Sequence, residues 1–201
     1  MKSKKERLHP ITRGFLPALV LFIFLVSLSP VLAQRDDPEN IPPPDSVIIA
    51  GTLQSALGCP GDWNTQCEDT LLVYDADDDL WTATFDMPAG SYEYKAALNG
   101  AWDDNYGLNA EYYGANIPLE VAEDGPVRFW YDHKTRWVSD SVNSLFAAVV
   151  GEFQAALGCP EAPAADCLRS LLTDPDGDGR YQFITAAIPA GEYDAIVALE
   201  A

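Results

Sequence analysis

The chain has 201 residues, with 12 lysines and arginines against 31 aspartates and glutamates, and its net charge at neutral pH is −19. A surface this negative repels nucleic acid and anionic lipid, so both are excluded as partners. A neutral ligand such as a polysaccharide remains compatible with the charge.

The first 33 residues predict a secretory signal peptide. A basic leader precedes an almost wholly apolar run over residues 15–28, and Ala33 follows at a suitable cleavage position. The alternative is a retained membrane anchor, but the run is shorter than the roughly 20 apolar residues that a spanning helix needs. Five basic residues and one acidic residue lie in this segment, so cleavage would leave a secreted chain with a net charge near −23.

Short strands are the expected elements after the leader. Residues 34–46 form a polar, proline-rich linker. Residues 47–142 then alternate short apolar runs with turn signals, which predicts an all-β sandwich. Asn99-Gly100 is expected to form a two-residue hairpin turn and 132–135 a second turn. The expected strands are Val47–Leu53, Thr70–Tyr74, Leu80–Asp86, Ser91–Leu98, Ile117–Val121, Val127–Tyr131 and Arg136–Val138.

The sequence then repeats itself. Residues 51–60 recur as residues 151–160, in a second copy that spans 146–201. A period this long fits a tandem of small domains better than a solenoid. The end of the second copy matches the region of Gly100 in the first copy, so about three strands have no counterpart. We therefore expect a second sandwich that is truncated at its C-terminus, within a fragment of a longer protein.

The four cysteines form two equally spaced pairs, Cys59 with Cys67 and Cys159 with Cys167. Export to an oxidising compartment favours closure of each pair as a disulfide, which would contribute about 2–3 kcal/mol. A metal site would need histidines nearby, but one of the two histidines lies in the leader and the other, His133, is far from both pairs in sequence. We therefore expect the cysteines to be structural.

One group of side chains in the first copy has the chemistry of a sugar site. Lys95 stands in a strand ahead of the Asn99-Gly100 turn and Trp102 follows the turn, while Trp63 lies in the cysteine-bounded loop and Asn116 begins a later strand. The C–H-rich face of a glucose ring can stack on an indole plane. Lysine and asparagine can then orient the sugar hydroxyls by hydrogen bonds.

The alternative for the tryptophans is a place in the core. We assign Trp81, Trp130 and Trp137 to the core, as is usual in small β-sandwiches. Trp63 and Trp102 differ because polar, turn-rich sequence surrounds them, and loop positions are commonly exposed.

The same region resembles known modules. Tyr92-x-Tyr94-Lys95 followed by Leu98-Asn99-Gly100-x-Trp102 resembles the family 48 starch- and glycogen-binding modules, which include the glycogen-binding domain of the AMP-activated protein kinase β subunit. The stretch from Gly51 to Trp137 is more closely similar to the tandem modules of bacterial pullulanases and amylopullulanases. The segments that carry this similarity are Leu53–Cys59, Ala97–Gly107 and Tyr131–Lys134.

The resemblance implies an immunoglobulin-like β-sandwich attached to an enzyme that acts on α-glucan. It also implies that Trp63, Lys95, Trp102 and Asn116 hold the glucan. Some modules of this type could instead only brace or space a catalytic domain.

The second copy departs from the pattern at the site. Pro163 stands in place of Trp63 and Ile196 in place of Lys95, and the counterpart of Trp102 would fall beyond the last residue. We therefore expect the binding site only in the first copy.

Asp174, Asp176 and Asp178 are weak calcium candidates because their carboxylates alternate as in a calcium loop. Thr185 stands where an EF-hand needs an acidic residue, so an EF-hand is excluded. A hairpin turn uses the same Asp and Gly chemistry.

No motif for catalysis is present. With 30 acidic residues after the leader, pairs of carboxylates arise by chance, and neither a nucleophile elbow nor a phosphate-binding loop occurs. His133 is expected to be an exposed turn residue. We expect no cofactor.

The resulting hypothesis is a secreted, non-catalytic region that binds α-glucan (starch, glycogen or pullulan) in a starch-degrading protein. Its partners would be the polysaccharide and a catalytic glycoside hydrolase domain beyond residue 201. One alternative is an accessory module that braces such a domain without binding sugar. The other is an N-terminal fragment of a pullulanase-type glycoside hydrolase.

Overall fold

The computed structural model describes residues 41–199, and the predictions of a signal peptide and of most of the linker lie outside the described residues. Strands and short 3-10 helices are the regular elements of this part of the chain. None of the helices in residues 41–199 is long and apolar enough to cross a membrane.

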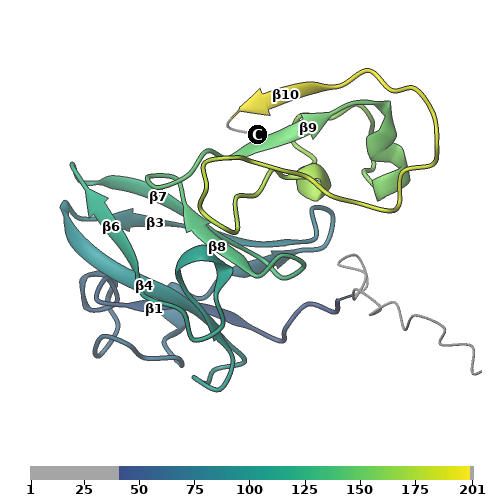
Figure 1. Cartoon of the computed structure of the whole chain (residues 1–201). Helices are drawn as coiled ribbons and strands as arrows, with labels where there is room; N and C mark the ends of the chain where they lie inside the picture. The colour runs from purple at the N-terminus through teal and green to yellow at the C-terminus, as the bar shows by residue number, and fades with distance from the viewer. Residues whose placement is uncertain (1–40, 200–201) are drawn as a thin grey trace, which may run out of the picture. The chain divides into compact units, whose positions relative to one another are not determined.

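The first copy is built from two antiparallel sheets (Figure 1). In one sheet the long strand β4 pairs with three others, and in the second sheet the order is β2-β3-β7-β8. The first sheet holds β1 (Val47–Gly51), β4 (Gly90–Leu98), β5 (Asn105–Tyr106) and β6 (Ile117–Val121). The second holds β2 (Val73–Asp75), β3 (Leu80–Met87), β7 (Gly125–Asp132) and β8 (Trp137–Asp140). The prediction of an all-β, immunoglobulin-like sandwich is thus confirmed.

In β6, apolar side chains that face the core alternate strictly with exposed residues. In β6, Ile117, Leu119 and Val121 are buried while the residues between them are exposed. They pack with apolar residues of both sheets, including Tyr94 of β4 and Phe129 of β7, whose rings meet edge to face at 5.2 Å. The core therefore lies between the sheets.

A buried hydrogen-bonded carboxylate also joins the two sheets. The Tyr94 hydroxyl of β4 donates to Asp140 Oδ2 of β8 at 2.6 Å, and both residues are buried. Asp140 Oδ1 accepts the backbone N–H groups of Val142 and Asn143. Burial raises the pKa of Tyr94 well above its ordinary value, so the phenol remains a donor.

All seven expected strands are present, with their ends shifted by a few residues, but one turn differs from its prediction. Asn99 and Gly100 have left-handed φ values of 55° and 67° and form the expected turn. Pairing resumes only where the Leu98 N–H donates to Asp104 O. The hairpin loop is therefore 99–103 rather than two residues, and β5 follows it.

The prediction that His133 is an exposed turn residue is wrong. His133 is only 1% exposed. Its Nε2 lies 3.5 Å from Asp79 Oδ1, and its ring meets Tyr74 edge-on at 6.2 Å. The turn between β7 and β8 folds over the turn between β2 and β3, and this tertiary contact buries the imidazole.

Both predicted disulfides are present. Cys59 is bonded to Cys67, and Cys159 is bonded to Cys167. All four cysteines are buried. The carboxylate of Asp69 lies close to the first pair, but sulfurs that are joined in a disulfide are not thiolates, which are the form that binds a metal. The four cysteines therefore act as cross-links within each copy.

The second copy repeats the start of the first. Its strand β9 (Ala147–Val150) pairs with β10 (Ile196–Leu199), and the helices η5 (Glu152–Leu157) and η6 (Leu168–Ser170) lie between them in sequence. Val150 stands opposite Ile196 just as Ala50 stands opposite Lys95, so Ile196 occupies the position of Lys95. Within the described residues, this strand pair is the only sheet of the second copy.

The second copy packs against β7 and β8 of the first copy. The ring centroids of Trp130 and Phe146 are 4.8 Å apart, and both residues belong to an apolar cluster shared by the two copies. The predicted core positions of Trp81, Trp130 and Trp137 are confirmed, since all three are buried. Trp130 and Trp137 lie in the shared cluster rather than between the sheets.

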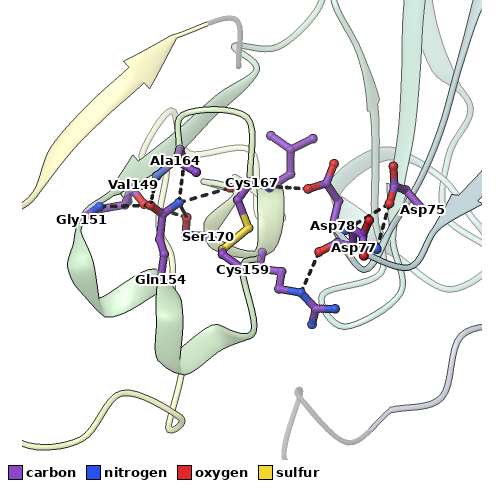
Figure 2. The surroundings of a disulfide bond; sticks show 12 residues. Asp75, Asp77, Asp78, Val149, Gly151, Gln154, Cys159, Ala164, Cys167 and Ser170 are labelled. Carbon is purple, nitrogen blue, oxygen red and sulfur yellow. Dashed lines mark hydrogen bonds between the residues drawn. A yellow bond between two sulfur atoms is a disulfide. The ribbon is translucent and has the colours of Figure 1, made fainter. Parts of the chain in front are cut away.

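Hydrogen bonds beside the disulfide between Cys159 and Cys167 add to this contact (Figure 2). The Arg169 guanidinium donates to the carbonyls of Ala76 and Asp77, each at 2.7 Å. The Leu168 N–H donates to Asp78 Oδ1 at 2.8 Å. In the first copy the matching residues are acidic, Glu68 and Asp69, which lack the guanidinium donors. This docking is therefore specific to the second copy.

Candidate functional site

The structure brings the four predicted binding residues together. Trp63, Lys95, Trp102 and Asn116 line one open pocket of about 300 Å³. The two indole centroids are 6.1 Å apart, and the ring planes are inclined by 43°. Residues from four separate segments of the first copy therefore form one surface, whose aromatic walls are not coplanar.

Lys95 reaches this surface because of strand alternation in β4. Its neighbours Tyr94 and Ala96 belong to the core between the sheets, so Lys95 projects from the opposite face. None of the ion pairs found in residues 41–199 involves Lys95. Its ammonium group is therefore available to a ligand as a hydrogen-bond donor.

Trp63 is held in a conformation that a non-glycine residue seldom adopts. Its φ is +57°, in the left-handed region, where an L-residue pays about 1–2 kcal/mol. The disulfide between Cys59 and Cys67 closes the surrounding loop. The Trp63 N–H also donates to Gly51 O at 3.4 Å. The loop thus imposes the position of the indole.

A buried glutamine fixes the same loop. Gln54 Oε1 accepts the N–H of Asn64 at 2.7 Å, and Gln54 Nε2 donates to Asn64 O at 2.8 Å and to Thr70 Oγ1 at 2.9 Å. Gln54 is fully buried. Gln54 therefore binds both backbone polar groups of Asn64, the residue that follows Trp63.

Trp102 stands on the loop between β4 and β5 and is 36% exposed. The Asn105 side chain donates to Trp102 O at 2.7 Å. The Thr65 hydroxyl donates to Gly100 O at 2.8 Å, which connects the loop of Trp63 with the turn that precedes Trp102. The two indoles are therefore positioned relative to each other by the backbone that carries them.

The second copy keeps this scaffold but lacks the side chains of the pocket. Gln154 makes the equivalent bonds, from Nε2 to Ala164 O at 2.9 Å and from Ala164 N–H to Oε1 at 3.0 Å (Figure 2). Pro163 precedes Ala164 where Trp63 precedes Asn64. The glutamine network is thus a property of the fold, whereas the pocket belongs to the first copy.

Sequence reasoning overlooked two exposed aromatic residues in the connection between β5 and β6. Tyr112 and Tyr113 are 54% and 56% exposed. Both hydroxyls donate to Asp103 O, at 2.7 Å and 3.2 Å, next to Trp102 in sequence. Two consecutive tyrosines between Glu111 and Gly114, in a segment with no strand pattern, are the signal that could have identified them.

A second cluster of titratable groups surrounds Asp79, outside this pocket. Burial opposes its ionisation, but the hydrogen bond from Tyr74 at 2.6 Å and the charge of Lys134 lower the pKa of Asp79. Burial and the same bond to Asp79 raise the pKa of Tyr74 to about 12. Burial lowers the pKa of His133, although the charge of Asp79 opposes this effect. The carboxylate of Asp79 thus contacts Tyr74, His133 and Lys134, as in a structural network, while the buried His133 Nδ1 has no hydrogen-bond partner among the described residues.

A larger cavity of about 630 Å³ lies between this cluster and the second copy. Its two cations already have partners, since Lys134 pairs with Asp79 at 3.1 Å and Arg169 binds backbone carbonyls. Among its described lining residues there is no tryptophan or tyrosine. The larger cavity therefore offers fewer side chains suited to sugar binding than the smaller pocket does.

The calcium candidates have the hydrogen bonds of a turn. The carboxylate oxygens of Asp174, Asp176 and Asp178 lie within 4.8 Å of one another. Asp174 accepts the N–H groups of Asp178 and Gly179, and Asp178 accepts the N–H of Arg180. This pattern is that of an Asp-rich turn, and calcium binding stays a prediction.

Both copies match a known protein family. The family model described as the pullulanase X25 domain matches residues 46–138 and 146–201. Similar curated proteins are the amylopullulanases of Thermoanaerobacterium thermosulfurigenes (37% identity over 87 residues), Thermoanaerobacterium saccharolyticum (38% over 87) and Thermoanaerobacter thermohydrosulfuricus (36% over 99).

These alignments cover 43%, 43% and 48% of this chain but only 5%, 7% and 7% of the relatives. The chain therefore matches less than a tenth of the length of these enzymes. A solved structure, the pullulanase from Bacillus acidopullulyticus, is similar with a TM-score of 0.45 and 27% identity, over 79% of this chain and 16% of that chain.

Proposed function

The chain belongs to the pullulanase X25 domain family, as its sequence resemblance predicts, and we propose that its first copy is a non-catalytic module that binds α-glucan for a starch-degrading enzyme. The observation that carries the proposal is the pocket lined by Trp63, Lys95, Trp102 and Asn116. Starch, glycogen and pullulan are the candidate ligands.

The chemistry of the pocket suits a hexose unit. Each indole can bury one apolar face of a sugar ring, and the Lys95 ammonium and the Asn116 amide can bind its hydroxyls. The planes of Trp63 and Trp102 are inclined by 43°. Inclined walls fit the bend between α-linked glucose units, whereas a flat β-linked chain would favour coplanar rings.

Binding at one small open pocket should be weak. The pocket has two aromatic walls and two polar side chains, and few polar groups fix the ligand. Weak attachment still serves an enzyme that works on a polymer, because tethering raises its effective concentration beside the substrate.

We also propose that the whole protein is an exported pullulanase-type glycoside hydrolase. The relatives carry the name amylopullulanase and are many times longer than the matched region, so a catalytic domain in the same polypeptide is the expected partner. Export is proposed from the basic and apolar leader in residues 1–33.

A second candidate function is mechanical support. The second copy lacks the side chains of the pocket, and it docks on the first copy through Arg169 and Leu168. Its role would then be to brace the binding module, a role that requires no sugar contact.

Affinity electrophoresis tests the binding proposal. Residues 34–201 should be retarded in a native gel that contains amylopectin or glycogen, and Trp102→Ala should migrate as it does without polysaccharide. Tyr193→Ala is the matched control, because Tyr193 is an exposed aromatic residue (43%) of the second copy. Unretarded migration of the unaltered chain would favour the supporting role alone.

A further inference from the structure

The second copy touches the first copy at one more place, the β5–β6 connection. This connection covers residues 107–116 and includes the short helix η4 (Leu108–Ala110). Gly177 lies so close to it that a Cβ atom at position 177 would be 2.5 Å from Asn109 Oδ1. The φ of Gly177 is +67°, in the left-handed region that favours glycine. Both the turn and the neighbouring loop therefore favour glycine at position 177.

The β5–β6 connection also packs on the apolar cluster that the two copies share. Ala110 is partly buried against this cluster, as is Tyr181 of the second copy, whose ring meets that of Trp137 at 6.2 Å. Asn109 and Ala110 have left-handed φ values of 60° and 54°. Backbone of this kind persists only where its surroundings enforce it, and the second copy supplies part of those surroundings.

Hydrogen bonds join the β5–β6 connection to the backbone that carries Trp102. The hydroxyls of Tyr112 and Tyr113 donate to Asp103 O at 2.7 Å and 3.2 Å. The Tyr113 N–H donates to Asn105 O at 3.1 Å, and the Asn105 side chain donates to Trp102 O at 2.7 Å. The position of the connection therefore influences the position of the Trp102 loop.

The tyrosines of the connection are not themselves walls of the pocket. Tyr106 belongs to the core between the sheets, and its ring packs on Tyr112 at 5.7 Å. Lys95 projects from the opposite face of the same sheet. The link from these tyrosines to the pocket consequently runs through hydrogen bonds and backbone, and not through a shared ligand surface.

The β5–β6 connection ends at a residue of the pocket. Asn116 is its last residue and lines the pocket together with the two indoles. The Leu108 N–H donates to Ala115 O at 2.8 Å, which bonds η4 to the residue before Asn116. A displacement of η4 should therefore reach Asn116 as well as Trp102.

We infer that the second copy positions the glucan-binding pocket of the first copy, and that Gly177 is the residue at which its turn seats the β5–β6 connection. This inference rests on the proposed function of the pocket, and it gives the bracing role of the second copy a specific contact. The bonds of Arg169 reach a different part of the first copy, the turn at residues 76–77, and lie outside this route. A seated connection holds Trp102 and Asn116 in place before a ligand binds, which lowers the entropic cost of binding.

A side chain at position 177 should unseat the connection. Gly177→Leu places atoms where Asn109 lies, and we expect the affinity of residues 34–201 for maltoheptaose to fall on the order of 5-fold in isothermal titration calorimetry. Gly179→Leu is the matched control, because Gly179 has a φ of +81° in the same turn but no atom within 4 Å of an added Cβ. Both variants carry left-handed strain, but Gly179→Leu should keep its affinity.

Two further measurements separate positioning from general destabilisation. The variant Gly177→Leu/Asn109→Gly removes the amide that the leucine meets, and glycine suits the left-handed φ at position 109. This double variant should regain most of the affinity. In ¹H–¹⁵N spectra without sugar, the Trp102 indole signal should shift in Gly177→Leu and return in the double variant, while the signal of the core residue Trp81 stays in place.

Thermal unfolding of each variant checks the fold. The inference is overturned if Gly177→Leu binds as tightly as the unaltered chain, if both leucine variants lose affinity equally, or if the double variant regains none. An unaltered chain that binds no maltoheptaose refutes the proposed function of the pocket, but the sugar-free spectra still test the contact. An unmoved Trp102 signal in Gly177→Leu refutes the positioning role whether or not the chain binds sugar.

Discussion

Thr65 and Gly100 are joined by a hydrogen bond of 2.8 Å from the threonine hydroxyl to the glycine carbonyl. Thr65 follows Trp63 by two residues, and Gly100 precedes Trp102 by two. This single bond connects the disulfide-closed loop to the β4–β5 loop. It therefore helps to set the separation of the two indoles.

Replacing Thr65 by valine should separate these two loops. The lost hydrogen bond should cost about 1 kcal/mol of stability, which corresponds to a fall of about 2–4 °C in Tm for a protein of this size. Affinity for maltoheptaose should fall several-fold, because the two indoles are no longer held together. Thr65→Ser keeps the hydroxyl and should restore both properties. Unaltered affinity of the valine variant would show that the bond does not position the site.

Gln54 and Gln154 allow a matched comparison between the copies. Gln54→Ala leaves the N–H of Asn64 without its acceptor, and Gln154→Ala does the same to Ala164. Each change should cost about 2–3 kcal/mol, since buried polar groups lose their partners. Only Gln54→Ala should also weaken glucan binding. Calorimetry measures the loss of affinity, and thermal unfolding measures the loss of stability. Equal losses of affinity in both variants would contradict a site confined to the first copy.

Arg169→Ala tests the contact between the copies. Its two bonds to carbonyls are exposed to solvent, so we expect a loss of no more than about 1 kcal/mol, with a lower Tm and faster proteolysis of the second copy. Arg180→Ala is the control, because that side chain is 88% exposed. Glucan affinity should be unchanged in both variants. A wild-type Tm in Arg169→Ala would argue against the docking.

His133 should make stability depend on pH. Burial lowers its pKa in the folded state below the ordinary value of about 6.5, so the unfolded chain binds a proton more readily. The stabilisation is therefore complete above about pH 6.5 and is lost as the pH falls through the folded pKa. The charges that act on the imidazole are those of Asp79, Asp132, Lys134 and Arg136, and the Tyr74 ring packs against it edge-on.

Thermal unfolding between pH 5 and pH 8 checks the direction of this pH dependence of stability. Tm should fall more steeply toward pH 5 in the unaltered chain than in His133→Gln, which has no proton to gain at this position. Parallel curves for the two proteins would show that the imidazole is not responsible.

Much of the first copy follows from local sequence patterns. The alternation of Ile117, Leu119 and Val121 is sufficient to predict β6 and its buried face. Lys95 and Trp102 flank a turn whose residues adopt left-handed φ, so their common face is also a local property. The approach of Trp63 to Trp102 was suggested by resemblance rather than by any pattern along the chain.

Local patterns of this kind do not predict contacts between segments that are distant in the sequence. His133 is buried because the turn of Tyr74 and Asp79 lies against it, 54 residues earlier in the chain. Comparison of the copies shows that Arg169 replaces Asp69, but not that its guanidinium reaches Asp77 O. The hydroxyl contacts of Tyr112 and Tyr113 to Asp103 O are likewise indicated by no spacing.

The indole N–H resonances offer the most direct test of the central claim, that Trp63 and Trp102 of the first copy hold an α-glucan. The chain has five tryptophans, and Trp81, Trp130 and Trp137 are buried. In ¹H–¹⁵N spectra of residues 34–201 titrated with maltoheptaose, with assignments from single Trp→Phe variants, we expect shifts of the Trp63 and Trp102 indoles while the other three stay in place. If the Trp63 and Trp102 signals do not move at saturating sugar, or if only the buried tryptophans respond, the pocket is not a glucan site.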